Sequence, residues 1–311
     1  MLENIQYVIK KAQFITINQR FLDTFVSKIS LSDIQKSLGK NDNAESGHYE
    51  EEINLLFLFS CINFAFWSLD AEEQLIEEAR TKRKEKIIKA IRTLLLDHKP
   101  KLLGTLLNSI SLDEFSKRFK NITPSFLNER WQNLREAGLI LEYKYNNSYM
   151  NVLMDAGFDA EKALSLTVKY FPSFDDRSIY KGREIEFHKR AQVLLGFISR
   201  IPDKLYKLTN IDKLIGGADY RIPQLLRHLK IIQYSKLLKD KIDKNALIES
   251  GSEEEIEIRA FTLWVIHLIK KMLYDKTRNT ITAMDVDCYL WSLNHKYGDL
   301  KPHHRTISIY Y

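Results

Sequence analysis

An acidic residue stands four positions before a proline in the segment Asp219-Tyr220-Arg221-Ile222-Pro223. Proline has no amide proton and is tolerated in a helix only within the first turn, so a helix is predicted to begin at or just after residues 219–222. The commoner use of an aspartate there is to cap the unpaired backbone amides. The alternative is a catalytic carboxylate on a rigid turn, with Gly216 and Gly217 allowing close approach of the backbone. These residues alone favour the cap.

A second group of polar and aromatic residues lies in the apolar run Ile53–Leu69. This run predicts a buried helix, because polar residues interrupt it and it is shorter than the roughly 20 residues that span a bilayer. If Asn63 is buried it needs hydrogen-bond partners, which the edge of a bound base would supply. Phe64, Phe66 and Trp67 suit either core packing or stacking on a flat heterocycle. For any one ring taken alone, core packing is favoured over contact with a ligand. For the three rings together, contact of at least one ring with a ligand is weighed equally with core packing of all three.

Two charged residues occur inside apolar helical patterns. Lys189 lies in the segment Arg183–Ile198, whose spacing predicts a helix. A lysine in such a segment either extends its ammonium to solvent, which is usual, or faces a polar cavity. Asp287 shares a predicted helix face with Leu290 and Trp291, where a core residue is expected. A carboxylate in that position requires a partner rich in hydrogen-bond donors.

The composition favours a soluble globular protein and an anionic partner. The 311 residues are 44% hydrophobic and 28% charged, with a formal net charge of +6 and a pI near 9.0; such a charge favours phosphate or nucleic acid, although weakly. The two cysteines, Cys61 and Cys288, indicate a reducing compartment. No metal-binding motif occurs, so we expect neither a metal site nor a cofactor. The start of the chain has no signal-peptide pattern, and we expect a cytoplasmic protein without a membrane anchor.

The rest of the pattern predicts helices joined by short loops. Residues 2–29 are expected to form two helices, residues 37–52 a polar surface loop, and the charged stretch 71–99 a solvated helix face. Further features are interpreted as scaffold: a capping box at Ser111–Glu114, a helix from Pro124 that stops at Gly138, a turn and cap at Asp175-Asp176, a helix over Glu253–Lys271, and a cap at Thr282–Asp285. Because alternating β-runs, phosphate loops and repeats are missing, residues 1–311 are predicted to form one compact all-α domain.

Six motifs in one order carry a resemblance to a known family. The chain resembles the queuosine salvage proteins, N-glycosidases that release queuine from queuosine 5′-phosphate, from about His48 to the last residue. It departs from the family pattern at Ser60, at Gly216-Gly217 and at Cys288. The motifs are Asn63-Phe64-Ala65-Phe66-Trp67, Phe187 to Gln192, Ala218 to Gln224, Glu257-Ile258-Arg259, Asp287 to Trp291, and His303-His304-Arg305-Thr306 closing on Tyr310-Tyr311.

The resemblance implies hydrolysis of a ribosyl N-glycosidic bond in an all-helical fold, with an architecture similar to that of DNA glycosylases. Asp219 would stabilise or attack the ribosyl cation, and Lys189 would keep Asp219 charged. Asp287 and Asn63 would bind the edge of the deazaguanine ring. The remaining implied substrate contacts are His48, Phe64, Phe66, Trp67, Tyr220, Arg221, Gln224, Trp291, His304 and Arg305.

Some alternatives stay open at this stage. The residues His303 to Arg305 suit either an ordinary basic tail or a site for the 5′-phosphate. The aromatic residues and the basic charge would also serve a nucleic-acid glycosylase or an RNA-binding protein, which should then bind with a steep salt dependence. A helical scaffold without activity would need neither Asn63 nor Asp287 within apolar faces. The expected partners are the nucleotide substrate and the product queuine, with no stable nucleic-acid partner.

Overall fold

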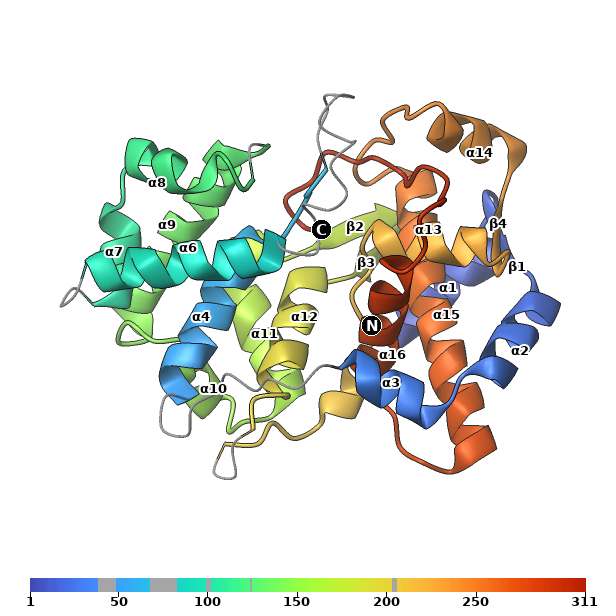
Figure 1. Ribbon diagram of the computed structural model, residues 1–311, viewed down its shortest axis with the longest axis horizontal. Helices are drawn as coiled ribbons and strands as arrows, with labels where there is room; N and C mark the ends of the chain where they lie inside the picture. Colours follow the sequence, from blue (N-terminus) through green and yellow to red (C-terminus); the bar gives the residue numbers. More distant parts are fainter. Residues whose placement is uncertain (39–48, 68–82, 99–101, 124, 203–205) are drawn as a thin grey trace.

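The computed structural model describes residues 1–38, 49–67, 83–98, 102–123, 125–202 and 206–311. The described part is mostly helical, which confirms the predicted fold class (Figure 1). The predicted polar loop, residues 37–52, and His48 within it lie largely outside the described residues. Both ends of the predicted loop are helical instead: Ser37 ends one helix, and residues 49–52 begin the next.

One group of helices packs around a core that contains Phe57, Tyr149 and Phe171. These aromatic side chains stack closely, with 4.4 Å between the ring centres of Phe57 and Tyr149. The group occupies the left and centre of Figure 1. Its helices are α4 (Tyr49–Ile62), α6 (Arg83–Asp97), α7 (Leu103–Ser109), α8 (Leu112–Phe119), α9 (Leu127–Lys144), α10 (Met150–Asp155), α11 (Ala160–Tyr170) and α12 (Lys189–Ile198).

A second group packs around a separate core built on the longest described helix, α15. This group lies on the right of Figure 1. Ser252 caps α15 by accepting a hydrogen bond from the Glu255 amide, at the start that the sequence predicted. The helices of this group are α1 (Leu2–Lys11), α2 (Gln19–Lys28), α3 (Leu31–Ser37), α13 (Arg221–His228), α14 (Lys236–Asp243), α15 (Glu253–Thr277) and α16 (Ala283–Asn294).

Two small antiparallel sheets add to the predicted helices. Strand β1 (Ile15–Ile17) pairs with β4 (Ile232–Tyr234), with Thr16 opposite Gln233. Strand β2 (Arg177–Tyr180) pairs with β3 (Arg183–Glu186). The prediction that Arg183 begins a helix was therefore wrong, because β3 precedes α12. Lys181 and Gly182 both have positive φ, and such a pair forms the tight turn of a two-residue hairpin.

Helix α4 ends earlier than its apolar sequence predicts. The expected helix continued to Leu69, whereas α4 stops at Ile62, and residues 63–67 continue without helical structure. No glycine or proline causes this stop. Instead, buried side chains donate hydrogen bonds to the last carbonyls, from Arg190 to Ser60 and Cys61, and from Arg130 to Ile62 and Phe64. The helix can end here because carbonyls without an intrahelical partner are satisfied by these cations.

Gly138 lies within α9 and does not end it, contrary to the predicted stop. A Cβ atom at Gly138 would lie 2.6 Å from Leu107 Cβ and 2.7 Å from the Asn108 nitrogen, both on α7. The glycine therefore allows α7 and α9 to approach closely. Among the described residues, no helix is long and apolar enough to cross a membrane.

The contact between α7 and α9 predicts a stability loss in the Gly138→Ala variant. The added methyl group meets backbone and Cβ atoms that cannot move independently, and such overpacking costs about 1–3 kcal/mol. Equilibrium urea unfolding should therefore give a lower free energy of unfolding. Gly298→Ala is the control, since a Cβ atom there meets nothing within 4 Å. Equal stability of the two variants would contradict this account.

Candidate functional site

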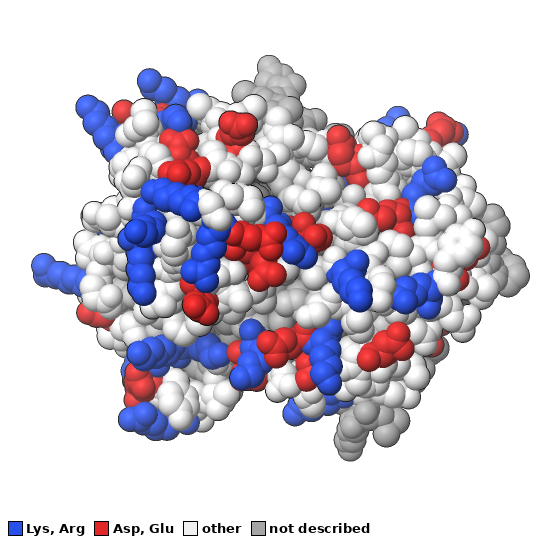
Figure 2. All heavy atoms as spheres, turned by 180° about the vertical axis from the view of Figure 1, so that it is seen from behind, with Lys and Arg blue, Asp and Glu red and all other residues white. Residues whose placement is uncertain are grey.

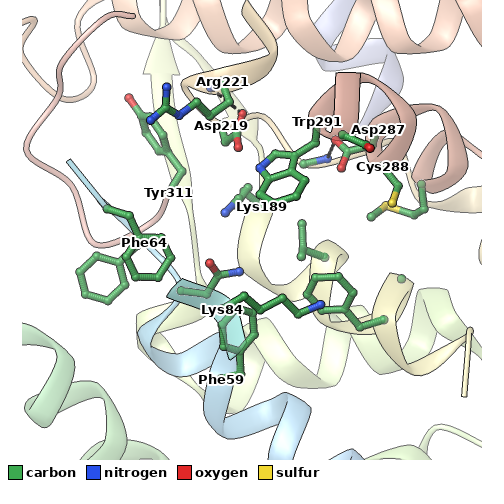
Figure 3. A pocket seen from close by; sticks show the side chains of 18 of the residues that line it. Phe59, Phe64, Lys84, Lys189, Asp219, Arg221, Asp287, Cys288, Trp291 and Tyr311 are labelled. Carbon is green, nitrogen blue, oxygen red and sulfur yellow. Dashed lines mark hydrogen bonds between the residues drawn. The ribbon is translucent and has the colours of Figure 1, made fainter. Parts of the chain in front are cut away.

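A cavity of about 300 Å³ lies where the two helical groups meet. One wall comes from α4, the segment after it, α6 and α12, and the other from α3, α13, α16 and Tyr311. Figure 3 shows Lys189, Asp219 and Trp291 directed into this space from different elements. The volume is at the lower end of the range for small-molecule sites, and the lining combines aromatic rings with charged groups, as such sites do.

Asp219 is both a helix cap and a member of the cavity wall. Its Oδ1 accepts hydrogen bonds from the amides of Arg221, at 2.8 Å, and Ile222, at 3.0 Å, at the start of α13. Pro223 lies in the first turn, as predicted. No described residue donates a hydrogen bond to the other oxygen, Oδ2, and Asp219 lines the cavity. The predicted cap is thus present on Oδ1, while Oδ2 stays available to the cavity, as the alternative of a catalytic carboxylate would require.

Lys189 faces the cavity rather than solvent. It is the first residue of α12, and its backbone amide donates to Asp176 Oδ2 at 3.2 Å, so Asp176 fixes the helix start. The side chain is buried and lines the cavity. Burial lowers the pKa of Lys189, while the negative charges of Asp219 and Asp287 oppose that shift. The lysine thus shares an electrostatic environment with both acids.

Asp287 is the second carboxylate of the cavity and projects from α16. Its Oδ1 accepts a hydrogen bond from the Gly217 amide at 2.8 Å. Burial and the charge of Asp219 raise the pKa of Asp287 to about 7, against the opposing effects of the Gly217 amide and Lys189. A Cβ atom at Gly217 would lie 2.7 Å from Val193 Cγ2, so glycine permits this backbone approach.

The segment after α4 supplies an amide and aromatic rings. Asn63, Phe64 and Phe66 line the cavity, and no described residue hydrogen-bonds the Asn63 side chain. The Arg130 guanidinium lies 4.3 Å from the centre of the Phe64 ring and 4.9 Å from that of Phe66. This cation–π packing fixes the two rings, while the Asn63 amide stays available to a ligand.

The structure brings together most of the residues that the sequence singled out. His48 lies outside the described residues. Those that line the cavity are Asn63, Phe64, Phe66, Lys189, Asp219, Tyr220, Arg221, Asp287 and Trp291, and those outside its wall are Trp67, Gln224, His304 and Arg305.

The four residues outside the wall pack around it. Trp67 is buried beside Phe64 and Tyr311, and the Arg305 guanidinium lies 6.0 Å from its ring centre. Gln224 hydrogen-bonds Arg221 and the Lys301 carbonyl. His304 is buried, and burial lowers its pKa to about 3. Its imidazole is therefore neutral near pH 7. This is not the cation that phosphate binding, one of the two expectations for His303 to Arg305, would require of it.

Several cavity residues were not identified from the sequence. Lys84 belongs to a basic run that was interpreted as a solvated face, yet its ammonium lies 4.3 Å from the centre of the Phe197 ring. Tyr311 was noted only as part of a motif, and Phe59 only as part of an apolar run. The sequence alone could not place these residues in the cavity, because they reach it from elements that are far apart along the chain. Others of this kind are Ser37, Arg83, Arg200, Met284, Cys288 and Ser292.

A buried cluster of charged side chains, Arg259, Asp176 and Glu255, lies next to the elements that line the cavity. Arg259 on α15 pairs with Asp176, which caps α12 at Lys189, and with Glu255 at 3.4 Å. Its guanidinium also lies 3.9 Å from the Phe187 ring centre and 4.4 Å from that of Tyr311. Asp176 thus has the predicted capping role. No set of three or more His, Cys, Asp or Glu side chains placed to bind a metal occurs in the described part of the chain.

Two carboxylates on one cavity are an arrangement that glycosidic-bond hydrolases use. The model of the queuosine salvage protein family matches residues 43–311, and the chain belongs to this family. Three queuosine 5′-phosphate N-glycosylase/hydrolases illustrate the similarity. The protein of Dictyostelium discoideum is 32% identical over 87% of this chain and 81% of its own length. That of Bos taurus is 30% identical over 85% and 83%, and that of Sphaerobacter thermophilus 26% over 100% and 97%.

The raised pKa of Asp287 predicts a pH-dependent stability difference between the protein and its Asp287→Asn variant. An acid whose folded pKa lies above its ordinary value of 3.8 favours the folded state when protonated. That contribution is lost as the pH rises through the window from about 4 to 7. The Asn variant cannot ionise, and its oxygen can still accept from Gly217. Relative to this variant, the parent protein should lose about 1–4 kcal/mol of unfolding free energy between pH 4 and pH 8.

Urea unfolding at several pH values measures this difference. Asp299→Asn is the control, because it removes one exposed carboxylate outside the cavity. A constant difference between parent and Asp287→Asn across the range would refute the raised pKa.

Proposed function

We propose that this chain hydrolyses the N-glycosidic bond of queuosine 5′-phosphate and releases queuine for use in tRNA modification. The observation that carries the proposal is the position of Asp219, whose Oδ1 caps α13 while Oδ2 is available to an aromatic-lined cavity shared with Lys189. The names of the similar proteins support the choice of substrate. The proposed location is the cytoplasm.

In the proposed reaction, water replaces the base on the ribose. The bond between C1′ and the ring nitrogen breaks, and the electron pair leaves with the base, so positive charge develops on the sugar. Asp219 would stabilise that cation or attack it, and Lys189 would keep Asp219 charged. Water then supplies the hydroxyl at C1′, its second proton replaces the one given to the departing base, and the products are queuine and ribose 5-phosphate.

The departing base needs a proton, and Asp287 is a source of one. The base lacks N7, so protonation there cannot assist its departure as it does in ordinary purines. Asp287, with its pKa raised to about 7, retains a proton near neutral pH and would transfer it to the base. Asn63 would hydrogen-bond the edge of the ring, between Phe64 and Trp291.

A nucleic-acid glycosylase or RNA-binding protein is the second candidate. The net charge of +6 favours it. On the face in Figure 2, however, Lys and Arg are mixed with Asp and Glu and do not form one continuous basic strip. The small cavity also suits a single nucleotide better than a polymer. Incubation of the protein with queuosine 5′-phosphate, with queuosine and with queuosine-containing tRNA, followed by mass spectrometry for free queuine, distinguishes these substrates.

The Asp219→Asn variant separates the helix-capping role of Asp219 from its proposed catalytic role. Asparagine keeps the oxygen that caps α13 but loses the negative charge, so turnover should fall by at least about 10²-fold. The melting temperature should stay close to that of the parent. Release of queuine is measured by mass spectrometry, and melting by circular dichroism.

A matched control is available for this variant. Asp159 also caps a helix, α11, by accepting from the Lys162 amide at 2.9 Å, and it lies outside the cavity. Asp159→Asn should retain activity. Near-normal turnover in Asp219→Asn would end the catalytic assignment.

A further inference from the structure

Helix α12, which carries Lys189, begins without a side-chain cap of its own. Its N-cap residue, His188, has a φ of 48° and makes no capping hydrogen bond from its side chain. This left-handed backbone is unfavourable for a residue other than glycine, and it persists where surrounding contacts determine it. The contacts come from Asp176. Its backbone carbonyl accepts from the amides of Phe187, at 3.0 Å, and His188, at 3.3 Å. Its Oδ2 accepts from the Lys189 amide at 3.2 Å, so one residue binds three consecutive amides at the start of α12.

Asp176 is itself held by Arg259, which belongs to the other helical group. Both side chains are buried, and both carboxylate oxygens of Asp176 accept hydrogen bonds from the Arg259 guanidinium, Oδ1 at 2.9 Å. Arg259 lies on α15, which packs in the second core, whereas α12 packs in the core that contains Phe57. The ion pair therefore connects the start of α12 to the opposite helical group.

A buried ion pair of this kind defines geometry better than it adds stability. The desolvation of two charges offsets much of their attraction, and well-packed apolar side chains of similar volume often stabilise a fold equally well. A planar guanidinium and a carboxylate joined by two hydrogen bonds, however, meet in one orientation. Such a pair is therefore suited to hold one helix start at a fixed place relative to another helix. It also gives a use to Arg259 in the motif Glu257-Ile258-Arg259, to which the proposed reaction assigns no role.

We propose that Asp176, held by Arg259, is a positioning residue that sets where Lys189 enters the cavity and thereby supports turnover. This inference rests on the proposed function, in which Lys189 keeps Asp219 charged. Neither Asp176 nor Arg259 lines the cavity, so their effect passes through the start of α12. Lys189 is the first residue of that helix, whereas Asp219 is fixed at the start of α13 (Figure 3). A shift of the start of α12 therefore moves the ammonium relative to the carboxylate.

A double-mutant cycle separates this role from a purely structural one. Asp176→Asn keeps an oxygen for the Lys189 amide but loses the charge that pairs with Arg259. The kcat for queuosine 5′-phosphate should fall by about tenfold or more while KM changes by less than about threefold, because misplacement acts on the reaction more than on binding. In a Lys189→Met background, the same substitution should lower kcat by less than about twofold, because residues that act through one side chain are not additive. Release of queuine is measured by mass spectrometry.

Two further variants complete the design. Arg259→Lys keeps the positive charge but cannot form two parallel hydrogen bonds with Asp176, so it should also lower kcat, to a smaller extent. Glu257→Gln is the control. This buried carboxylate lies on the same helix, but it accepts from the amides of Gln13 and Phe14 in the N-terminal segment, at 2.9 and 2.8 Å. Its loss should lower the melting temperature and leave kcat close to that of the parent.

The outcomes distinguish this proposal from the proposed function. Equal losses of kcat from Asp176→Asn in the parent and in the Lys189→Met background would overturn the role of Asp176, and so would a parent-like kcat in Asp176→Asn. Either result leaves the proposed function standing, whereas absence of turnover by the parent protein would overturn that function. In that case, hydrogen exchange followed by mass spectrometry still tests the positioning of α12. Faster exchange over residues 187–190 in Asp176→Asn than in Glu257→Gln supports it, and equal exchange refutes it.

Discussion

The site depends on the hydrogen bonds by which buried arginines end α4. A helix terminus inside a protein leaves carbonyls that must be satisfied, and here Arg190 and Arg130 supply the donors. Because the helix stops, the next residues become free to turn into the cavity, and Arg130 packs its guanidinium against the rings of Phe64 and Phe66. The same two side chains therefore satisfy the backbone and place one aromatic wall.

Elsewhere around the cavity, the same groups cap helices and line or support the cavity. Asp219 caps α13 with one oxygen and presents the other to the cavity, and Asp176 caps α12 while binding Arg259. Lys189 and Asp219 are thus fixed at helix starts. Burial favours the neutral form of Asp287, although the positive charge of Lys189 is close.

The sequence predicted the helical class, the starts of α13 and α15, and nine of the residues that line the cavity, because these depend on local signals and on the family motifs. It did not predict the end of α4, because that end is set by side chains distant in the chain. Gly138 gave a misleading stop signal, since a glycine that permits close helix packing looks the same as one that ends a helix. Gly182 is a turn residue that could have indicated the β2–β3 hairpin. The helical spacing of the residues that follow led instead to the prediction of a helix from Arg183. Lys84 and Tyr311 carried no signal of their own for the cavity.

The cavity lies between the two hydrophobic cores. Lys189 and Asn63 belong to elements that pack in one core, and Asp219 and Asp287 belong to elements that pack in the other. The arrangement of these cavity residues therefore depends on how the two cores pack against each other, whereas the integrity of each core does not. On heating, a small shift of one core relative to the other would displace Lys189 from Asp219 and Asp287 while most helices are still intact. Loss of activity is then expected to precede loss of the circular dichroism signal, and a ligand that contacts both sides of the cavity would bring the two events closer together.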